Sequence, residues 1–252
     1  MEVHHHPHVE KKSFKEYLLE GLMIFLAVSM GFIAENIREH FSDKAKEKEF
    51  ISSLKEDLVS DTISLHHYIP SAITQYEKLD SLFDLLQLAV NQKPYSIHNL
   101  YYLNFKYAFG ILAFHQNKRT ISQLKNTGSY NLITGKASKD EITQYDNLNQ
   151  FLDQLYIDLS EWTKNTNYMS QKIFDYTYSK TFAFGGEAEI YKKDSLPLHL
   201  LTTDKSLLME YSNKVRSLMM MSDNYIKIEK QVLEENKKAI QIVNKEYHLE
   251  KE

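Results

Sequence analysis

The histidines near the N-terminus have the spacing that most resembles a metal site. Residues 4–8 read His-His-His-Pro-His, and imidazole nitrogens bind zinc, copper and nickel. Pro7 interrupts the run, unlike the six consecutive histidines of an affinity tag, and no cysteine or carboxylate completes a closed ligand set. A metal-binding tail, a partial tag and a flexible polar tail all stay open. The candidate metal ligands are His4, His5, His6 and His8.

Two further groups of residues carry possible ligand chemistry. Asp57 and Asp61 are one helical turn apart and His66 and His67 follow them, so these four could form a metal site. We favour a simpler interpretation, in which they line the water-exposed face of a helix. The run 219–221 offers three methionine thioethers, but consecutive side chains on a helix diverge, so we expect one or two to fill the core.

Motifs for catalysis are missing from the sequence. It has no Gly-rich phosphate loop, no G-x-S-x-G, no H-E-x-x-H and no carboxylate pair with recognisable catalytic spacing. It has no cysteine, which excludes disulfides, thiol nucleophiles and cysteine metal sites. The net charge of −4 gives no electrostatic basis for binding nucleic acid. We therefore expect a protein that is not an enzyme and holds no cofactor.

One apolar segment determines the class of the protein. Gly21–Ala34 contains no charge, and Tyr17–Ile37 contains 21 residues. As a helix these 21 residues measure about 31 Å, enough to cross a hydrocarbon core of about 30 Å. Glu20 and Glu35 lie near its ends, where charges reach the headgroups. We predict a transmembrane helix over 17–37, with a cleaved signal peptide and a buried soluble helix as alternatives.

One face of this segment is suited to helix association. Glu20, Ala27, Gly31, Ala34 and Glu35 fall on one side of an α-helix, together with Ile24. Ala27 and Gly31 form a small-xxx-small pair, which allows a second helix to approach closely. We predict that this face contacts a protein partner or a second copy of the chain. Proton relay by Glu20 is an alternative, although a position near the helix end explains this residue more simply.

The distribution of lysine and arginine gives a weak indication of topology. Lys11, Lys12 and Lys15 precede the span closely, whereas the four basic residues that follow it are more dispersed: Arg38, Lys44, Lys46 and Lys48. The higher density before the span favours a cytoplasmic N-terminus. We predict a cytoplasmic tail (1–16), a transmembrane helix (17–37) and an extracytoplasmic domain (38–252) in the periplasm of a bacterial inner membrane.

The rest of the chain predicts helices. Gly and Pro number only 7 and 4 of 252 residues, which favours long helices over barrels and sandwiches. Apolar spacing predicts a helix over 42–69 that continues the span, and Pro70 is expected to end or kink this helix. Two further helices are predicted over 73–86 and 97–114. Further helices are expected over 119–125, with a left-handed cap at Gly128, and over 203–247.

One more long helix is expected between 125 and 203, and the sequence marks where it begins. Ser138 and Glu141 fit a capping box, and the helix behind them could run about 40 residues. We predict an all-α fold, in which one N-terminal transmembrane helix is followed by an antiparallel helical bundle with long helices. The many Tyr and Phe residues are expected in its core.

Several segments of the sequence resemble a known family. They are Phe14–Glu20, Ala34–Glu39 with the tail histidines, the residues Leu54, Asp57, Leu58 and Asp61, and a block comprising Thr120–Leu124, Gly128, Leu132 and Ile133. They are similar to a family of uncharacterised bacterial single-pass membrane proteins and cover roughly a third of the chain. The resemblance implies an anchored extracytoplasmic helical domain, and it supplies no catalytic residue.

These observations predict a membrane-anchored structural or accessory protein that acts through helix–helix and protein–protein contacts. One alternative is an extracytoplasmic ligand sensor that signals through its single span to a separate partner. A ligand pocket between helices would favour this alternative. The other alternative is metal binding by the histidine-rich tail.

Overall fold

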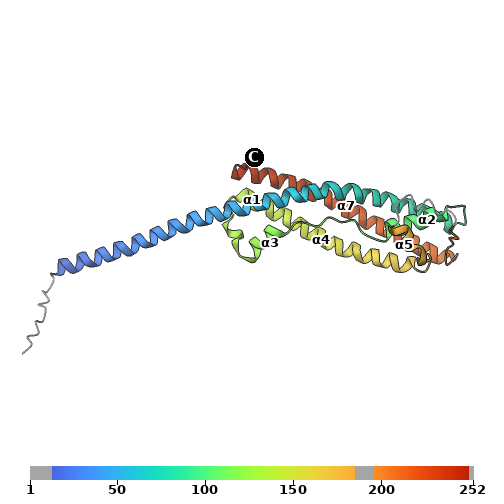
Figure 1. Cartoon of the computed structure of the whole chain (residues 1–252), viewed down its shortest axis with the longest axis horizontal. Helices are drawn as coiled ribbons and strands as arrows, with labels where there is room; N and C mark the ends of the chain where they lie inside the picture. Colours follow the sequence, from blue (N-terminus) through green and yellow to red (C-terminus); the bar gives the residue numbers. More distant parts are fainter. Residues whose placement is uncertain (1–12, 185–195, 250–252) are drawn as a thin grey trace, which may run out of the picture. The chain divides into compact units, whose positions relative to one another are not determined.

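Helices make up most of the part of the chain that its structure, a computed structural model, describes, which is residues 13–184 and 196–249 (Figure 1). These residues contain no β-strand, and Phe174 and Leu200 form an isolated bridge. The expectation of an all-α fold is confirmed. The elements in chain order are α1 (Phe14–Val90), α2 (Ile97–Leu103), the π-helix η1 (Asn104–Ala108), α3 (Arg119–Asn126), the 3-10 helix η2 (Ser129–Leu132), α4 (Lys136–Ser170), the 3-10 helix η3 (Tyr176–Tyr178), α5 (Ser179–Phe184) and α7 (Lys205–Tyr247).

The chain divides into two compact units, Met1–Phe50 and Ile51–Glu252. The described part of the first unit is the N-terminal portion of α1, which contains the predicted helix over 17–37. Its apolar side chains are exposed, as Phe25 and Phe32 illustrate at 66% and 70%. The second unit holds the remainder of α1 and all other elements, and it contains the hydrophobic core.

Pro70 does not end the helix, which excludes the first of the two outcomes expected for it, an end or a kink. α1 runs through it to Val90 and absorbs the helix predicted over 73–86. Proline removes one backbone donor, which leaves the carbonyl of His66 without its intrahelical bond. Both residues lie on the exposed face of α1, where water can take over that hydrogen bond. Position on the outer face therefore explains why the helix tolerates this proline.

Three long helices form the core of the second unit through a seven-residue repeat. In α1 every seventh residue from Ile51 to Leu86 is buried, and the same spacing holds in α4 from Ser138 to Thr166. In α7 it holds from Tyr211 to Ala239. α1 and α4 run in the same direction, and α7 runs antiparallel to both (Figure 1). Seven-residue spacing keeps one face of each helix toward its neighbours, as in coiled-coil packing.

Because α1 and α4 run in the same direction, the chain has to return along the bundle between them. Residues 109–118, which we call the strap, leave η1 and return along the bundle to α3 without regular secondary structure (Figure 1). An extended residue spans about 3.3 Å, against about 1.5 Å in a helix, so such a connection covers a given length with fewer residues than a helix would. The sequence prediction of a helix over 97–114 is therefore wrong beyond Ala108. The strap has no regular backbone pairing, so side chains of the long helices must satisfy it.

The region between the strap and α4 combines a correct and an incorrect prediction. The helix expected over 119–125 is α3, and Gly128 after it is left-handed with φ of +69°, as expected. The capping box is wrong, because α4 begins at Lys136 and its N-cap is Gly135. Ser138 lies inside the helix, where its backbone N–H donates to Glu246 Oε2 at 2.7 Å. The first turn of α4 is therefore capped by the Glu246 carboxylate of α7 instead of by the side chain of Ser138.

Aromatic rings fill the end of the bundle near α2 and α5. Tyr101 and Phe174 are fully buried and meet edge to face at a centroid distance of 5.1 Å. The Tyr101 hydroxyl donates to the carbonyl of His199 at 2.7 Å and accepts from the amide of Asp175 at 2.9 Å. The Tyr211 hydroxyl donates to the side chain of Asn104. The prediction that aromatic residues form the core is confirmed for these rings, whereas Phe151 and Tyr168 are 49% and 67% exposed.

Candidate functional site

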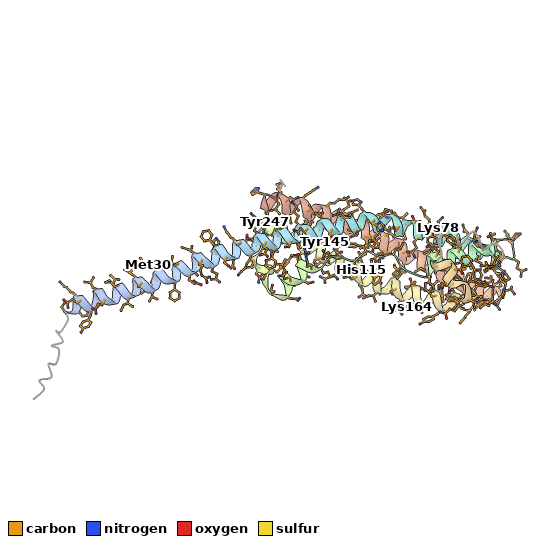
Figure 2. The ribbon with its side chains drawn as sticks, in the orientation of Figure 1. Met30, Lys78, His115, Tyr145, Lys164 and Tyr247 are labelled. Carbon is orange, nitrogen blue, oxygen red and sulfur yellow. The ribbon has the colours of Figure 1, made fainter. Side chains whose placement is uncertain are left out.

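The exposed apolar part of α1 is the first candidate site. Within the described residues, α1 is the one helix long and apolar enough to cross a membrane, as judged by length and composition. None of that apolar stretch is buried within the chain. Figure 2 shows its side chains, around Met30, projecting outward from the ribbon. A continuous apolar surface of this length is unfavourable in water, so it requires a covering of lipid or protein.

The predicted association face lies within this stretch. Ala27, Gly31 and Ala34 are all exposed, and a methyl group added at Gly31 would meet no atom within 4 Å outside its own helix. Glu35 is ion-paired with Arg38 one turn further on, with Arg38 Nε donating to Glu35 Oε2 at 2.9 Å. Glu20 is exposed as well. Within residues 13–184 and 196–249 the small side chains of this face are therefore not covered by another element, and its role in association stays a prediction.

A second candidate site lies in the core of the bundle. Asp57 and Asp61 are each only 2% exposed, so the expectation that they line a wet helix face is wrong. Asp57 accepts from the backbone N–H of Thr120 at 2.9 Å and from Asn117 Nδ2 at 3.0 Å. Asp61 accepts from the backbone N–H of Asn117 at 2.8 Å. Both carboxylates of α1 thus hold the end of the strap and the first turn of α3.

The electrostatics of the two carboxylates differ. Arg119 places its guanidinium 2.9 Å from Asp57, at the rim of the bundle. Asp61 instead accepts from the Tyr145 hydroxyl at 2.7 Å (Figure 2 labels Tyr145). Burial raises the pKa of Asp61 to about 6, although the hydrogen bonds from Asn117 and Tyr145 oppose the rise. Burial and the adjacent Asp61 raise the pKa of Tyr145, which keeps it a proton donor.

These contacts join two sequence blocks that the resemblance to a family singled out separately. The first block contains Leu54, Asp57, Leu58 and Asp61, and the second begins at Thr120. The hydrogen bond from Thr120 to Asp57 links them directly. The sequence carried a signal for this burial, because Asp57 and Asp61 are interspersed with leucines of the buried face of α1. Because aspartate side chains are mostly exposed in proteins, the two residues were nevertheless expected on the outer face.

A buried carboxyl on α7 was missed altogether by sequence reasoning. Glu229 is 0% exposed, and its Oε1 accepts from the backbone N–H of Phe114 at 3.1 Å. Asn236, seven residues further on and also 0% exposed, donates to the carbonyl of Leu58 at 2.9 Å. The seven-residue spacing from Leu208 through Val215 marks both positions as core. Buried polar side chains at such positions fix the register of neighbouring helices at a cost in stability.

The remaining predicted ligands do not gather into a site. His66 and His67 are exposed, and no cluster of three or more histidine or acidic residues suited to a metal occurs in residues 13–184 and 196–249. Met219 is buried and Met220 is 68% exposed, which confirms that the methionine run diverges. The tail histidines His4, His5, His6 and His8 lie outside the described residues.

The bundle has a small internal cavity and a larger groove on its surface. The space between α1, α4, α7 and the strap has a volume of about 10 Å³, roughly that of one water probe, and Leu79, Gly110, Leu159 and Leu218 are among its lining residues. An open groove of about 380 Å³ lies on the surface between α1 and α2. Its lining residues are Lys78, Ser81, Asp84, Leu85, Asn99, Tyr102 and Leu103.

Comparison with known proteins adds no relative. No protein-family profile, curated protein sequence or solved structure matches this chain. The molecule offers two candidate sites, the exposed apolar stretch of α1 and the buried carboxyl groups of the bundle. The carboxyl groups of Asp57 and Asp61 are engaged with backbone and side-chain donors, which suits a structural role.

Proposed function

We propose that this chain is a membrane-anchored, non-enzymatic structural or accessory protein that acts through helix–helix and protein–protein contacts. The observation that supports the proposal is the apolar stretch of α1, none of which is buried by the chain's own fold. In water this surface would promote aggregation, whereas in a bilayer it is matched by the surrounding hydrocarbon. Anchoring by residues 17–37 is the simplest way to accommodate it.

The association face gives the anchor a second role in this proposal. A span whose only task is anchoring needs no small residues on one side, whereas Ala27, Gly31 and Ala34 would let the backbone of a second helix approach closely. Because the fold of the chain places nothing against Gly31, its small size is free to serve an external contact. The partner is a membrane helix of another protein or of a second copy.

The proposed topology places the tail (1–16) in the cytoplasm and residues 38–252 in the periplasm of a bacterial inner membrane. The basic residues Lys11, Lys12 and Lys15 beside the span support this direction. Reporter fusions to the two ends would test it directly. Activity of a periplasm-dependent reporter at the N-terminus, or its inactivity at the C-terminus, would reverse the assignment.

The function itself is tested by native purification of the full-length chain in mild detergent, followed by mass spectrometry. The test variant carries Ala27→Leu and Gly31→Leu, which fill the association face. The matched control is Ser29→Leu, since this small residue lies on the opposite side of the same helix. We expect a stoichiometric partner, or a homo-oligomer, that is retained by the control and lost in the test variant.

Two results would count against the proposal. A strictly monomeric wild-type chain without partners would remove its central claim. Extraction of the wild-type chain from membranes by alkaline carbonate would contradict the anchor. If a partner is found but is unaffected by the leucine substitutions, the contact lies in the bundle instead of the span.

Ligand sensing is a second candidate function, favoured by the groove between α1 and α2. Its volume of about 380 Å³ falls at the lower end of the range for small-molecule sites. Lys78 and Asp84 provide charges of both signs, and Tyr102 provides an aromatic ring. A screen of small zwitterionic compounds by thermal shift would test this function, with Tyr102→Ala as the variant expected to lose any response. A response that survives Tyr102→Ala would place the ligand elsewhere.

A further inference from the structure

The strap (109–118) is held in place by side chains instead of by secondary structure. Three of its backbone amides donate to side-chain oxygens of the long helices. Leu112 donates to Gln75 Oε1 at 3.2 Å, Phe114 to Glu229 Oε1 at 3.1 Å, and Asn117 to Asp61 Oδ1 at 2.8 Å. Two of these three acceptors, Glu229 and Asp61, are titratable carboxyl groups.

At Phe114 the strap is attached to α7 by two side-chain bonds. Glu229 accepts from the amide of Phe114, and the Tyr225 hydroxyl donates to the carbonyl of the same residue at 3.2 Å. Phe114 and Ala113 are buried, at 1% and 7% exposed. The strap therefore closes over the core at this point, and it also covers Glu229.

The surroundings of Glu229 disfavour its charged form. Its second oxygen, Oε2, has no hydrogen-bond partner, and within residues 13–184 and 196–249 the side chain forms no ion pair. Tyr225 precedes Glu229 by one turn on α7, and Asp153 and Tyr156 of α4 lie near Tyr225. On the strap, His115 meets Tyr156 edge to face and Lys118 is ion-paired with Asp153.

We propose that the strap is a proton-controlled latch, closed over the bundle core while the Glu229 carboxyl is neutral and released when that carboxyl ionises. A neutral carboxyl still accepts from Phe114 and leaves no buried charge. An ionised carboxyl with one unpartnered oxygen gains hydration if the strap moves away. Opening exposes Phe114 and the apolar core beneath it, which presents a new surface.

The direction of the pH dependence follows from the two states of Glu229. Burial raises its pKa from 4.5 to about 7 in the closed state, against the opposing effect of the Phe114 amide. In the open state the carboxyl is hydrated and titrates near 4.5. The latch is therefore tightest below pH 4.5 and loosens as the pH rises to about 7. Between pH 5 and 7.5 the opening equilibrium increases about 50-fold by this linkage.

Hydrogen exchange of the full-length chain in detergent, read by mass spectrometry, tests the latch. After correction for the intrinsic exchange rate, we expect the protection of strap peptides to fall several-tens-fold from pH 5 to 7.5. Peptides from the buried face of α7 serve as the internal reference and should change little. Glu229→Gln keeps the acceptor for Phe114 without a titratable proton, so it should remove the contribution of Glu229 and leave only the smaller part that Asp61 adds at Asn117. Glu234→Gln, an exposed neighbour, should behave like the wild type.

Three outcomes would overturn the proposal. The first is unchanged strap protection across this pH range in the wild type. The second is a parallel loss in the α7 peptides, which would indicate global unfolding. The third is an unchanged pH dependence in Glu229→Gln. If that variant does not fold, a single cysteine at Ala113 replaces it, because the chain has no other cysteine. Its labelling rate, corrected for thiolate fraction, must then rise with pH for the latch to stand.

Discussion

Replacing Asp57 by alanine tests the role assigned to the buried carboxylates most directly. The substitution removes the acceptor for the amide of Thr120, for the side chain of Asn117 and for the guanidinium of Arg119. Thr120 is itself 2% exposed, so water does not readily replace the lost acceptor. The first turn of α3 and the end of the strap would lose their attachment to α1.

The magnitude follows from these three contacts. A buried amide that loses a charged acceptor costs about 1–3 kcal/mol, and the Asn117 amide group adds about 1 kcal/mol. The Arg119 pair adds little, because this side chain is 60% exposed and solvent screens it. We expect a total near 3 kcal/mol, a large part of the 5–15 kcal/mol typical of a domain. With a urea m-value of about 2–3 kcal/mol/M, the midpoint falls by about 1 M.

The assay is urea unfolding of the full-length chain in mild detergent, followed by the fluorescence of Trp162, its single tryptophan. Glu56→Ala is the matched control, because Glu56 is the adjacent residue and approaches the same Arg119 at 3.4 Å, but its side chain is 70% exposed. We expect this control to shift the midpoint only slightly. Equal shifts for the two variants, or an Asp57→Ala shift below about 0.3 M, would refute the assigned role.

Three further substitutions test separate parts of the structure. Tyr145→Phe removes the hydroxyl that donates to Asp61. Because the pKa of Asp61 is raised to about 6 in the folded chain, the contribution of Asp61 to stability declines as the pH rises from about 4 through 6. The deficit in unfolding free energy should be about 1 kcal/mol at pH 4 and up to about 3 kcal/mol at pH 7.5, and urea titrations at both values would measure it. An equal deficit at both pH values would contradict the ionisation of Asp61 between them. Gly128→Ala should cost about 1 kcal/mol because of its positive φ, although space is available, whereas Gly31→Ala should leave the urea midpoint unchanged.

The long helices could be predicted from the sequence because their signals are local. Apolar spacing along α1, α4 and α7 reflects burial of one face, and the run of uncharged residues from Gly21 to Ala34 needs no knowledge of other elements. Pro70 was misleading because proline's effect depends on which face it occupies. Position relative to the bundle is a tertiary property, so its exposure could not be read from its immediate neighbours.

The strap could not be predicted because distant residues determine it. The stretch 97–114 has helix-like composition, yet its end has no regular secondary structure in the fold, where Gln75 and Glu229 satisfy its backbone. Glu229 is 115 residues away along the chain from the amide that it binds. The burial of Asp57 and Asp61 was missed although leucines of the buried face surround them in the sequence, because the donors that satisfy both carboxyl groups come from a distant segment. Their acceptor role becomes visible only when α3 is placed beside α1.

The antiparallel pairing of α1 with α7 has a consequence for biosynthesis. Asn236 hydrogen-bonds to the carbonyl of Leu58, so residues 178 positions apart must meet before this pairing is complete. At about 5–20 residues per second, a ribosome needs roughly 10–35 s to extend the chain by that length. During this interval the leucine-rich face of α1 has been made but its partner has not. That face is where a chaperone or a protease would meet the nascent chain.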